Sequence, residues 1–419
     1  MSLGPISRSV DVLLARQAIF DRDRKLYGYE LLYRSNTSAG GFDGTAADLA
    51  TLQVLSNTLV SIGAENVLGG KKAFVNFDHR LLRDKIYAAL PKDSIVIEIL
   101  ETVDPAEDLD ALCKTIAGQG YSLALDDFTD EVKLEPLTHL VRVIKIDMRL
   151  TSREDQERML RTYKPRGITM LAEKVETYAE FDWARRAGYD LFQGYFFARP
   201  VIVRGQQIPA VKMSCLRLLR EMHAPEIDFD RVEELLREDV ALTYKLLRYV
   251  NSAMFARRTE IQSIGRALMV LGEDGIRRWV ALATLPTLAT DKPTELLTMS
   301  LLRARFCEKL AEQTKDGRPG KAFLMGMFSL LDALIDQPLD EALRNVDLGR
   351  EVTEALLGVG ESDNSLAPLH ELILNYEQGN WDAVEQIARQ CSIPLPATGD
   401  AYLDSAEWAE EIIKLNGGG

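Results

Sequence analysis

The amino-acid sequence predicts an α/β fold, a modified TIM-type (βα)8 barrel, followed by an all-α domain. Residues 11–200 alternate short apolar, strand-like runs with helix-like patterns, whereas residues from about 210 to 390 are helical nearly throughout. Several of the strand-like runs end in carboxylates. A chain of 419 residues is also too long for one ordinary hydrophobic core, which favours two domains.

Eight strand-like segments with interleaved helices in about 200 residues favour a closed barrel. Only residues 21–25 separate the first two strands, which is too short for a crossover helix, so we expect that pair to be antiparallel. The expected strands are 11–20, 26–34, 72–78, 94–100, 121–127, 141–148, 167–174 and 190–197. The expected helices are 46–62, 80–90, 105–117, 154–163 and 178–187.

The character of the sequence changes after residue 200. A short polar stretch with Gly205 and Pro209 indicates a linker, and Leu/Ala-rich amphipathic segments without a fixed repeat indicate a helical bundle. We expect the two halves to fold independently. The predicted division is a barrel at 1–203, a linker at 204–210, a helical domain at 211–400 and a C-terminal helix or tail at 401–419. The expected helices of the second half are 211–222, 231–237, 241–250, 263–271, 275–282, 300–312 and 322–334.

Composition excludes several classes of protein. The net charge of −14 argues against nonspecific binding to nucleic acid or to anionic membranes. The sequence has neither an apolar run near 18 residues nor a signal-peptide pattern, so we expect a cytoplasmic protein that does not span a membrane. The four cysteines are too scattered for a zinc motif or a disulfide framework and indicate reduced thiols.

Charged side chains follow the apolar runs on consecutive strands. Glu98, Asp126 and Glu173 each come directly after such a run, and Lys145 follows Val143-Ile144. A buried strand that ends in an acid is costly unless the acid meets a cation or solvent. In a (βα)8 barrel, catalytic residues come from the C-terminal ends of several strands. A metal-dependent enzyme site at that end is therefore the first hypothesis.

The chemistry of the candidate ligands favours Mg²⁺ or Mn²⁺. Carboxylate oxygens, the amide oxygen of Asn76 and the absence of nearby His or Cys are typical of hard-cation sites. Adjacent Asp126 and Asp127 suit two ions, which lie about 4 Å apart in phosphodiester hydrolysis. Arg34 follows Glu30 by four residues and would meet a phosphate. Taken singly, each group has a simpler explanation: a solvent-exposed strand end, a turn at Asp126-Asp127, or alternation along a half-buried strand at 145–147.

Together these segments resemble the EAL domain, the family of cyclic di-GMP phosphodiesterases. The resemblance covers residues 11–200 and follows the family's motif order. The matching segments are Glu30-Leu31-Leu32 with Arg34, Asn76 in 74–77, Glu98 and Glu101 in 97–101, Asp126-Asp127-Phe128, Lys145-Ile146-Asp147, Glu173 and Glu176 in 172–177, and Gln193-Gly194-Tyr195 in 193–200.

The resemblance implies a role for each matching residue. It implies hydrolysis of cyclic di-GMP to linear pGpG with two Mg²⁺ or Mn²⁺ ions, the second position weaker. Implied metal ligands are Glu30, Asn76, Glu98, Asp126, Asp127 and Glu173. Lys145, Glu176 and Gln193 would order the reactive water, Arg34, Leu32 and Asp147 would contact the ligand, and Glu101 would support a loop.

Three positions depart from the family pattern. Residues 129–133 replace a glycine-rich loop with a glycine-free, charged segment that cannot copy its backbone geometry. Leu31 replaces the signature alanine, and Lys174 replaces a glycine. The altered loop predicts a poorly ordered second metal, so that ligand binding survives while hydrolysis is slow and rises with Mn²⁺ concentration.

The helical half resembles the HDOD domain, a relative of the HD-GYP phosphohydrolases. The matching segments are 239–242, 246–255, 261–267 and 271–272. Only His223 and His370 lie in this half, and no His-Asp pair occurs, so we expect both to be ordinary structural residues. The resemblance implies a protein-interaction or signalling-output domain with an unidentified protein partner.

Three functions remain open from the sequence. The first is a two-metal cyclic di-GMP phosphodiesterase with a helical output domain. The second is a cyclic di-GMP receptor with little or no hydrolytic activity that signals through the helices. The third is an interaction scaffold that binds no nucleotide. The complete ligand set favours the first over the third, and the altered loop favours the second over the first.

Overall fold

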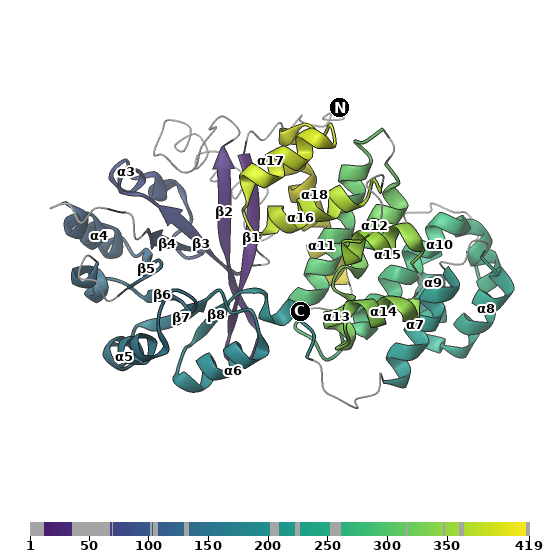
Figure 1. Cartoon of the computed structure of the whole chain (residues 1–419), viewed down its shortest axis with the longest axis horizontal. Helices are drawn as coiled ribbons and strands as arrows, with labels where there is room; N and C mark the ends of the chain where they lie inside the picture. The colour runs from purple at the N-terminus through teal and green to yellow at the C-terminus, as the bar shows by residue number, and fades with distance from the viewer. Residues whose placement is uncertain are drawn as a thin grey trace. The chain divides into compact units, whose positions relative to one another are not determined.

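Eight strands close into one barrel in the computed structural model (Figure 1). β1 (Val12–Asp21) pairs antiparallel with both β2 and β8, and all other neighbours are parallel, which confirms the barrel and the antiparallel first pair. The other strands are β2 (Leu26–Ser35), β3 (Lys72–Phe77), β4 (Ile95–Ile99), β5 (Ser122–Leu125), β6 (Val143–Asp147), β7 (Thr169–Glu173) and β8 (Leu191–Gln193). The structure describes residues 12–35, 68, 70–100, 103, 108–129, 134–201, 209–222, 227–251, 261–315, 317–346, 348–359 and 364–415.

Short helices connect the barrel strands. The predicted helix 80–90 is two pieces, because Lys85 between them takes a left-handed conformation with φ 56°. The predicted helix 46–62 lies outside the described residues. The described helices of the barrel are α3 (His79–Arg83), η2 (Ile86–Ala89), α4 (Leu109–Gly118), η3 (Glu135–His139), α5 (Arg153–Tyr163), η4 (Lys164–Arg166), α6 (Tyr178–Ala187) and η5 (Tyr195–Ala198).

One layer of apolar side chains fills the lower barrel interior. Seven strands contribute one buried residue each, so the barrel is packed and is not a pore. This layer consists of Ile19, Phe74, Val96, Ala124, Val143, Leu171 and Leu191.

In the residues that the structure describes, the second half is helical throughout, as predicted. Predicted helices 263–271 and 275–282 lie within one element, α10, kinked at Gly272, whose φ of 65° and ψ of 178° are not helical. Predicted helix 322–334 is split at Leu330. Among the described residues, no helix is long and apolar enough to cross a membrane. The helices are α7 (Ala210–Met222), α8 (Phe229–Glu238), α9 (Val240–Val250), α10 (Ile264–Leu288), α11 (Thr294–Ala311), α12 (Pro319–Phe328), α13 (Leu331–Ile335), α14 (Leu339–Val346), α15 (Arg350–Leu357), α16 (Ala367–Glu377), α17 (Trp381–Gln390) and α18 (Leu395–Leu415).

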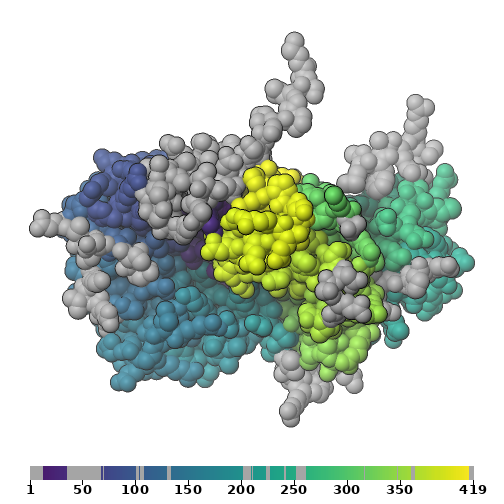
Figure 2. Space-filling model, turned by 45° about the horizontal axis from the view of Figure 1, so that its top comes forward, coloured from purple at the N-terminus to yellow at the C-terminus, as the bar shows by residue number. Residues whose placement is uncertain are grey.

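The last helices belong with the barrel. Contacts divide the chain into Met1–Arg199 with Leu372–Gly419, and Pro200–Glu371. This differs from the predicted division, which placed 372–400 in the helical domain. The reason is the packing of α18 on β1: the buried Arg16 side chain lies 3.1 Å from Glu410, and the Arg16 backbone N–H donates to the Tyr402 hydroxyl. Figure 2 shows these C-terminal residues (yellow) against the purple surface of the first strands.

We predict that a chain ending at residue 371 is markedly less stable than the full chain. Deletion would leave buried Arg16 without Glu410, and a buried charge that loses its partner costs roughly 3–5 kcal/mol. Thermal melting and binding of a hydrophobic dye would measure the effect. A chain ending at Leu415 is the control. Equal melting of the two truncated chains would contradict this assignment of the C-terminal helices.

We also predict that His370 makes the protein sensitive to acid. Burial, with the nearby Arg303 cation, lowers the pKa of His370 to about 4, although its Nδ1 lies 3.2 Å from the Ala355 carbonyl oxygen. Between pH 6.5 and 4, His370 is therefore protonated in the unfolded chain but not in the folded chain. The free energy of unfolding falls as the pH falls through this range.

The free energy of unfolding should decrease between pH 7 and pH 5 by about 2 kcal/mol less in His370→Gln than in wild type. Urea unfolding at both pH values would measure it, with exposed His139→Gln as the control. An unchanged pH dependence in His370→Gln would show that this side chain is not the acid-sensitive group.

Candidate active site

A layer of polar side chains lies directly above the apolar layer of the barrel. Residues two apart on a strand face the same side, so the residue two positions beyond each apolar interior residue also faces inward. On β1, which runs the opposite way, it is the residue two positions before. Every strand contributes one member. The polar layer consists of Gln17, Glu30, Asn76, Glu98, Asp126, Lys145, Glu173 and Gln193.

Lys145 is the cation at the centre of this layer. Its side chain is fully buried, and its Nζ atom lies 2.7–3.1 Å from oxygens of four carboxylates on four different strands or strand ends. These distances are 3.1 Å to Glu30, 2.8 Å to Glu98, 2.7 Å to Asp126 and 2.9 Å to Glu173. Four carboxylates that are far apart in the sequence therefore meet at one ammonium group.

Two side-chain amides donate hydrogen bonds to Glu30. The side-chain amides of Asn76 and Gln193 donate to its two oxygens at 3.0 and 2.7 Å. Gln193 also donates to Gln17 Oε1 at 3.0 Å. Glu30 thus accepts hydrogen bonds from β3 and β8 in addition to the bond from Lys145 on β6.

The site has more acceptor oxygens than protons to satisfy them. An ammonium group carries three donors, whereas four carboxylates face Lys145. Apart from the contacts with Lys145, buried side-chain oxygens of Glu98, Asp126, Glu173 and Asn76 have no hydrogen-bond partner. Oxygens of Glu30, Glu98 and Asp126 lie within 4.8 Å of one another. These side chains are buried, offer only oxygen atoms and lack enough hydrogen-bond donors. Together they fit a site for a hard divalent cation.

Electrostatics in the layer are strongly coupled. Burial raises the pKa of Glu98 and of Glu173 well above the usual value, and the neighbouring carboxylates add to the shift, although Lys145 opposes it. Burial works against the charged form of Glu30 as well, but Lys145 and the amide hydrogen bonds outweigh it and lower its pKa. Burial alone would lower the pKa of Lys145, but the four carboxylates raise it well above its ordinary value. The layer thus favours the charged forms of Lys145 and Glu30 and the protonated forms of Glu98 and Glu173.

The backbone after β8 fixes Gln193. Gly194 has a φ of 142°, and a Cβ atom there would lie 2.1 Å from the Val175 carbonyl oxygen. Only glycine permits this approach, which lets the Val175 N–H donate to the Gln193 carbonyl oxygen at 2.9 Å. The Gln-Gly pair in the sequence therefore has a structural cause.

A second cluster lies at the ends of β5, β6 and β7. Lys174 adopts a left-handed conformation with φ 55°, and its Nζ atom lies 2.5 Å from Asp147 and 3.9 Å from Asp127. Asp147 also accepts from the N–H groups of Arg149 and Leu150. The ammonium of Lys174 thus stands beside the carboxylate predicted to bind the second metal.

Other predicted residues lie outside the polar layer. Glu176 is half-exposed and forms an ion pair with Arg149. Leu32 and Arg34 follow Glu30 on the same face of β2, and Arg34 lies 2.6 Å from Asp382 on α17. Glu101 and residues 130–133 of the altered loop lie outside the described residues, and Thr129 is exposed.

Gln17 is a member of the polar layer that the sequence interpretation missed. It pairs with Glu30 in the β1–β2 register and contacts Gln193. The available signal was weak: a polar residue beside Arg16 in a mostly apolar strand, two positions before buried Ile19. The acid that does end β1, Asp21, pairs with Leu191 at the start of β8, because β1 runs antiparallel to β8, so it lies at the opposite end of the barrel from the polar layer.

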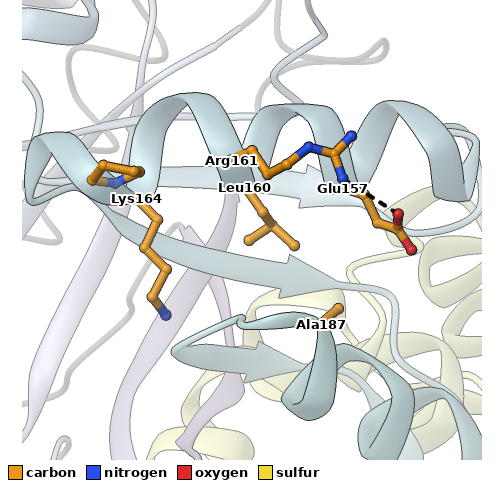
Figure 3. Close-up of a pocket in the computed structure, with 6 residues that line it drawn as sticks. Glu157, Leu160, Arg161, Lys164 and Ala187 are labelled. Carbon is orange, nitrogen blue, oxygen red and sulfur yellow. Dashed lines mark ion pairs between the residues drawn. The ribbon is translucent and has the colours of Figure 1, made fainter.

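The barrel also has a surface pocket of about 530 Å³ beside α5 and η4, away from the polar layer (Figure 3). Glu157, Leu160, Arg161, Lys164, Pro165 and Ala187 line it. Glu157 and Arg161 form an i,i+4 ion pair of 3.6 Å across one wall. No member of the polar layer lines this pocket.

Family models match both halves of the chain. The EAL domain model matches residues 8–200, and the HDOD domain model matches residues 208–336. Residues 201–207 lie between the two matches. They confirm both resemblances that the sequence motifs carry.

Relatives match nearly the whole chain. It is 35% identical over 410 residues to the uncharacterized protein YuxH of Bacillus subtilis, covering 96% of this chain and 99% of YuxH. It is 35% identical over 405 residues to the cyclic di-GMP phosphodiesterase CdgJ of Vibrio cholerae, covering 96% of this chain and 93% of CdgJ. Among solved structures, the calcium and cyclic di-GMP complex of Klebsiella pneumoniae BlrP1 is 26% identical, with a TM-score of 0.38, and covers 48% of this chain and 58% of that chain. The chain therefore belongs to the family in which an EAL domain is followed by an HDOD domain, together with YuxH and CdgJ.

Proposed function

We propose that this protein is a metal-dependent cyclic di-GMP phosphodiesterase that opens its substrate to linear pGpG. The observation that carries the proposal is the polar layer, in which one buried ammonium meets four carboxylates at the C-terminal end of an EAL barrel. The relative CdgJ, similar along nearly its whole length, bears the name of the same activity.

The proposed metal site uses oxygen ligands only. Glu30, Asn76, Glu98 and Asp126 would hold the first Mg²⁺ or Mn²⁺ ion, and Asp127 with Glu173 would complete a second position. Bound there, the metal supplies a water of lowered pKa and charge compensation for the phosphate. The hydrogen-bond deficiency of these oxygens supports the assignment.

The chain's own residues would position water and substrate. Lys145 and Gln193 lie in the polar layer and would hold the attacking water by giving it one N–H each in place of a present acceptor, and Glu176 would assist from the rim. Arg34, with Leu32 beside it, would bind the phosphate and base from β2, and Asp147 would contact the ligand from the end of β6. Attack of the water oxygen on phosphorus breaks the bond to the 3′ oxygen, which takes up the proton, and leaves a 5′ phosphate.

A cyclic di-GMP receptor with slow hydrolysis is the second candidate. Two observations favour it: the Lys174 ammonium stands within 3.9 Å of Asp127, and the glycine-rich family loop is replaced at 129–133. A fixed cation beside Asp127 reduces the attraction of that carboxylate for a second metal ion. Binding would then depend on the first position and turnover on the second.

For the helical domain we propose an interaction role with a protein partner. Within the described residues, the one group of three or more potential metal-ligating side chains that can meet at an ion is Glu30, Glu98 and Asp126, which lies in the barrel. His370 is held neutral by burial, as a structural residue would be. The affinity of this partner for the helical domain would depend on whether the barrel has bound cyclic di-GMP.

We predict that Lys145→Met destabilises the metal-free protein. Removing the cation leaves four buried carboxylates facing one another, which costs roughly 3–5 kcal/mol. Mn²⁺ should stabilise this variant more than wild type, because it replaces the lost charge. Melting in chelator and in Mn²⁺ would measure both effects.

The control is Lys114→Met, which breaks only an exposed pair with Asp110. If Lys145→Met melts like wild type in chelator, Lys145 is not the central cation of the layer.

We further predict that purified protein with Mn²⁺ converts cyclic di-GMP to pGpG, with a rate that rises with Mn²⁺ concentration. Glu30→Ala should abolish product and weaken Mn²⁺ binding in calorimetry, because it removes a shared ligand of the first metal position. Chromatography of the products decides the reaction. Binding of the dinucleotide without product would favour the receptor, and equal Mn²⁺ binding by both proteins would overturn the metal assignment.

A further inference from the structure

The residues of β2 that are expected to contact the ligand are covered by the C-terminal part of the chain. Leu32 and Arg34 lie two and four residues beyond Glu30, so all three share one face of the strand. Gly379, between α16 and α17, approaches Leu32 so closely that a Cβ atom would lie 3.0 Å from its Cδ1 atom. Asp382, in the first turn of α17, lies 2.6 Å from Arg34.

The same segment also reaches the polar layer. The Gln17 side-chain amide donates to the carbonyl oxygen of Glu377 at 3.2 Å, and Gln17 accepts from Gln193. Gln17, Leu32 and Arg34 are therefore all contacted within residues 377–385, on the face of β1 and β2 that carries the acidic site. We call residues 377–385 the acidic cover.

Arg34 is engaged by two carboxylates of the cover. Nη1 lies 2.6 Å from Asp382, and Nη2 lies 4.0 Å from Glu385. The Arg34 side chain is 13% exposed, and the Asp382 side chain is 89% exposed. The guanidinium is therefore mostly buried, whereas the carboxylate that pairs with it is largely in solvent. Terminal guanidinium nitrogens are the atoms with which arginine binds phosphate bidentately.

We propose that the acidic cover competes with the ligand's phosphate for Arg34, and that Asp382 and Glu385 thereby set the affinity for cyclic di-GMP. This inference rests on the proposed function, since it assumes that Arg34 binds the phosphate. A phosphate and the two carboxylates cannot share the terminal nitrogens without strong repulsion. Ligand binding must therefore displace the acidic cover. The apparent affinity for cyclic di-GMP is reduced in proportion to the fraction of molecules in which the cover is paired with Arg34. A partner that draws the C-terminal helices away would raise the affinity.

The direct test is calorimetric titration of the full-length protein with cyclic di-GMP in Ca²⁺, together with steady-state kinetics in Mn²⁺. Asp382→Asn keeps the shape of the side chain and removes its charge. We expect the dissociation constant and KM to fall about two- to five-fold, as an exposed ion pair allows, with kcat unchanged. Asp382→Glu, which keeps the charge, should resemble wild type.

Two controls separate competition from general charge effects. Glu411→Gln removes an exposed charge from α18, which should leave the affinity unchanged. In an Arg34→Gln background, Asp382→Asn should not change the dissociation constant further, because the guanidinium for which the carboxylate and the phosphate compete is absent.

Three outcomes overturn the inference. Weaker or unchanged binding by Asp382→Asn would show that Asp382 orients Arg34 or is neutral. Equal tightening in the Arg34→Gln background would indicate a general charge effect. Absence of dinucleotide binding by every variant would overturn the proposed function itself.

Discussion

The contact of one ammonium with four carboxylates is the constraint on which the barrel interior depends. Lys145 sits fully buried on β6, and its partners come from β2, β4, β7 and the end of β5. Burying such charges is unfavourable unless they are paired with good geometry. The strand register that places the polar layer above the apolar layer is therefore also the register that satisfies Lys145. A slip by one residue would turn every member of the layer away from the interior.

Local sequence was sufficient for most of the barrel and for much of the candidate site. Four members of the polar layer directly follow apolar runs: Glu98, Asp126, Lys145 and Glu173. The end of such a run can be recognised from the local sequence alone. Gln17 was missed because it lies in the middle of a strand that runs the opposite way, and its role follows only from pairing with Glu30 across the hairpin. The kink at Gly272 was equally hard to foresee, because glycine is tolerated within many helices.

The packing of the C-terminal helices could not be inferred from local patterns. The Arg34–Asp382 and Arg16–Glu410 pairs join residues more than 340 positions apart. Each partner looks like an ordinary surface charge in its own segment, because amphipathic periodicity shows that a helix has an apolar face and not what covers it. Neighbouring Arg16 and Gln17 show the result: Arg16 contacts α18 while Gln17 contacts Gln193 and Glu377.

The discontinuity of the barrel unit has a consequence for synthesis on the ribosome. Its first part ends at Arg199, its last part begins at Leu372, and the helical unit is translated between them. At roughly 5–20 residues per second, the nascent barrel waits on the order of ten seconds or more for the helices that pack on β1. Throughout that interval β1 can pair with β2 and β8, but Arg16 is without Glu410 and Tyr402 of α18. Nascent chains would thus expose the first strand of the barrel to chaperones for longer than a barrel encoded in one continuous segment.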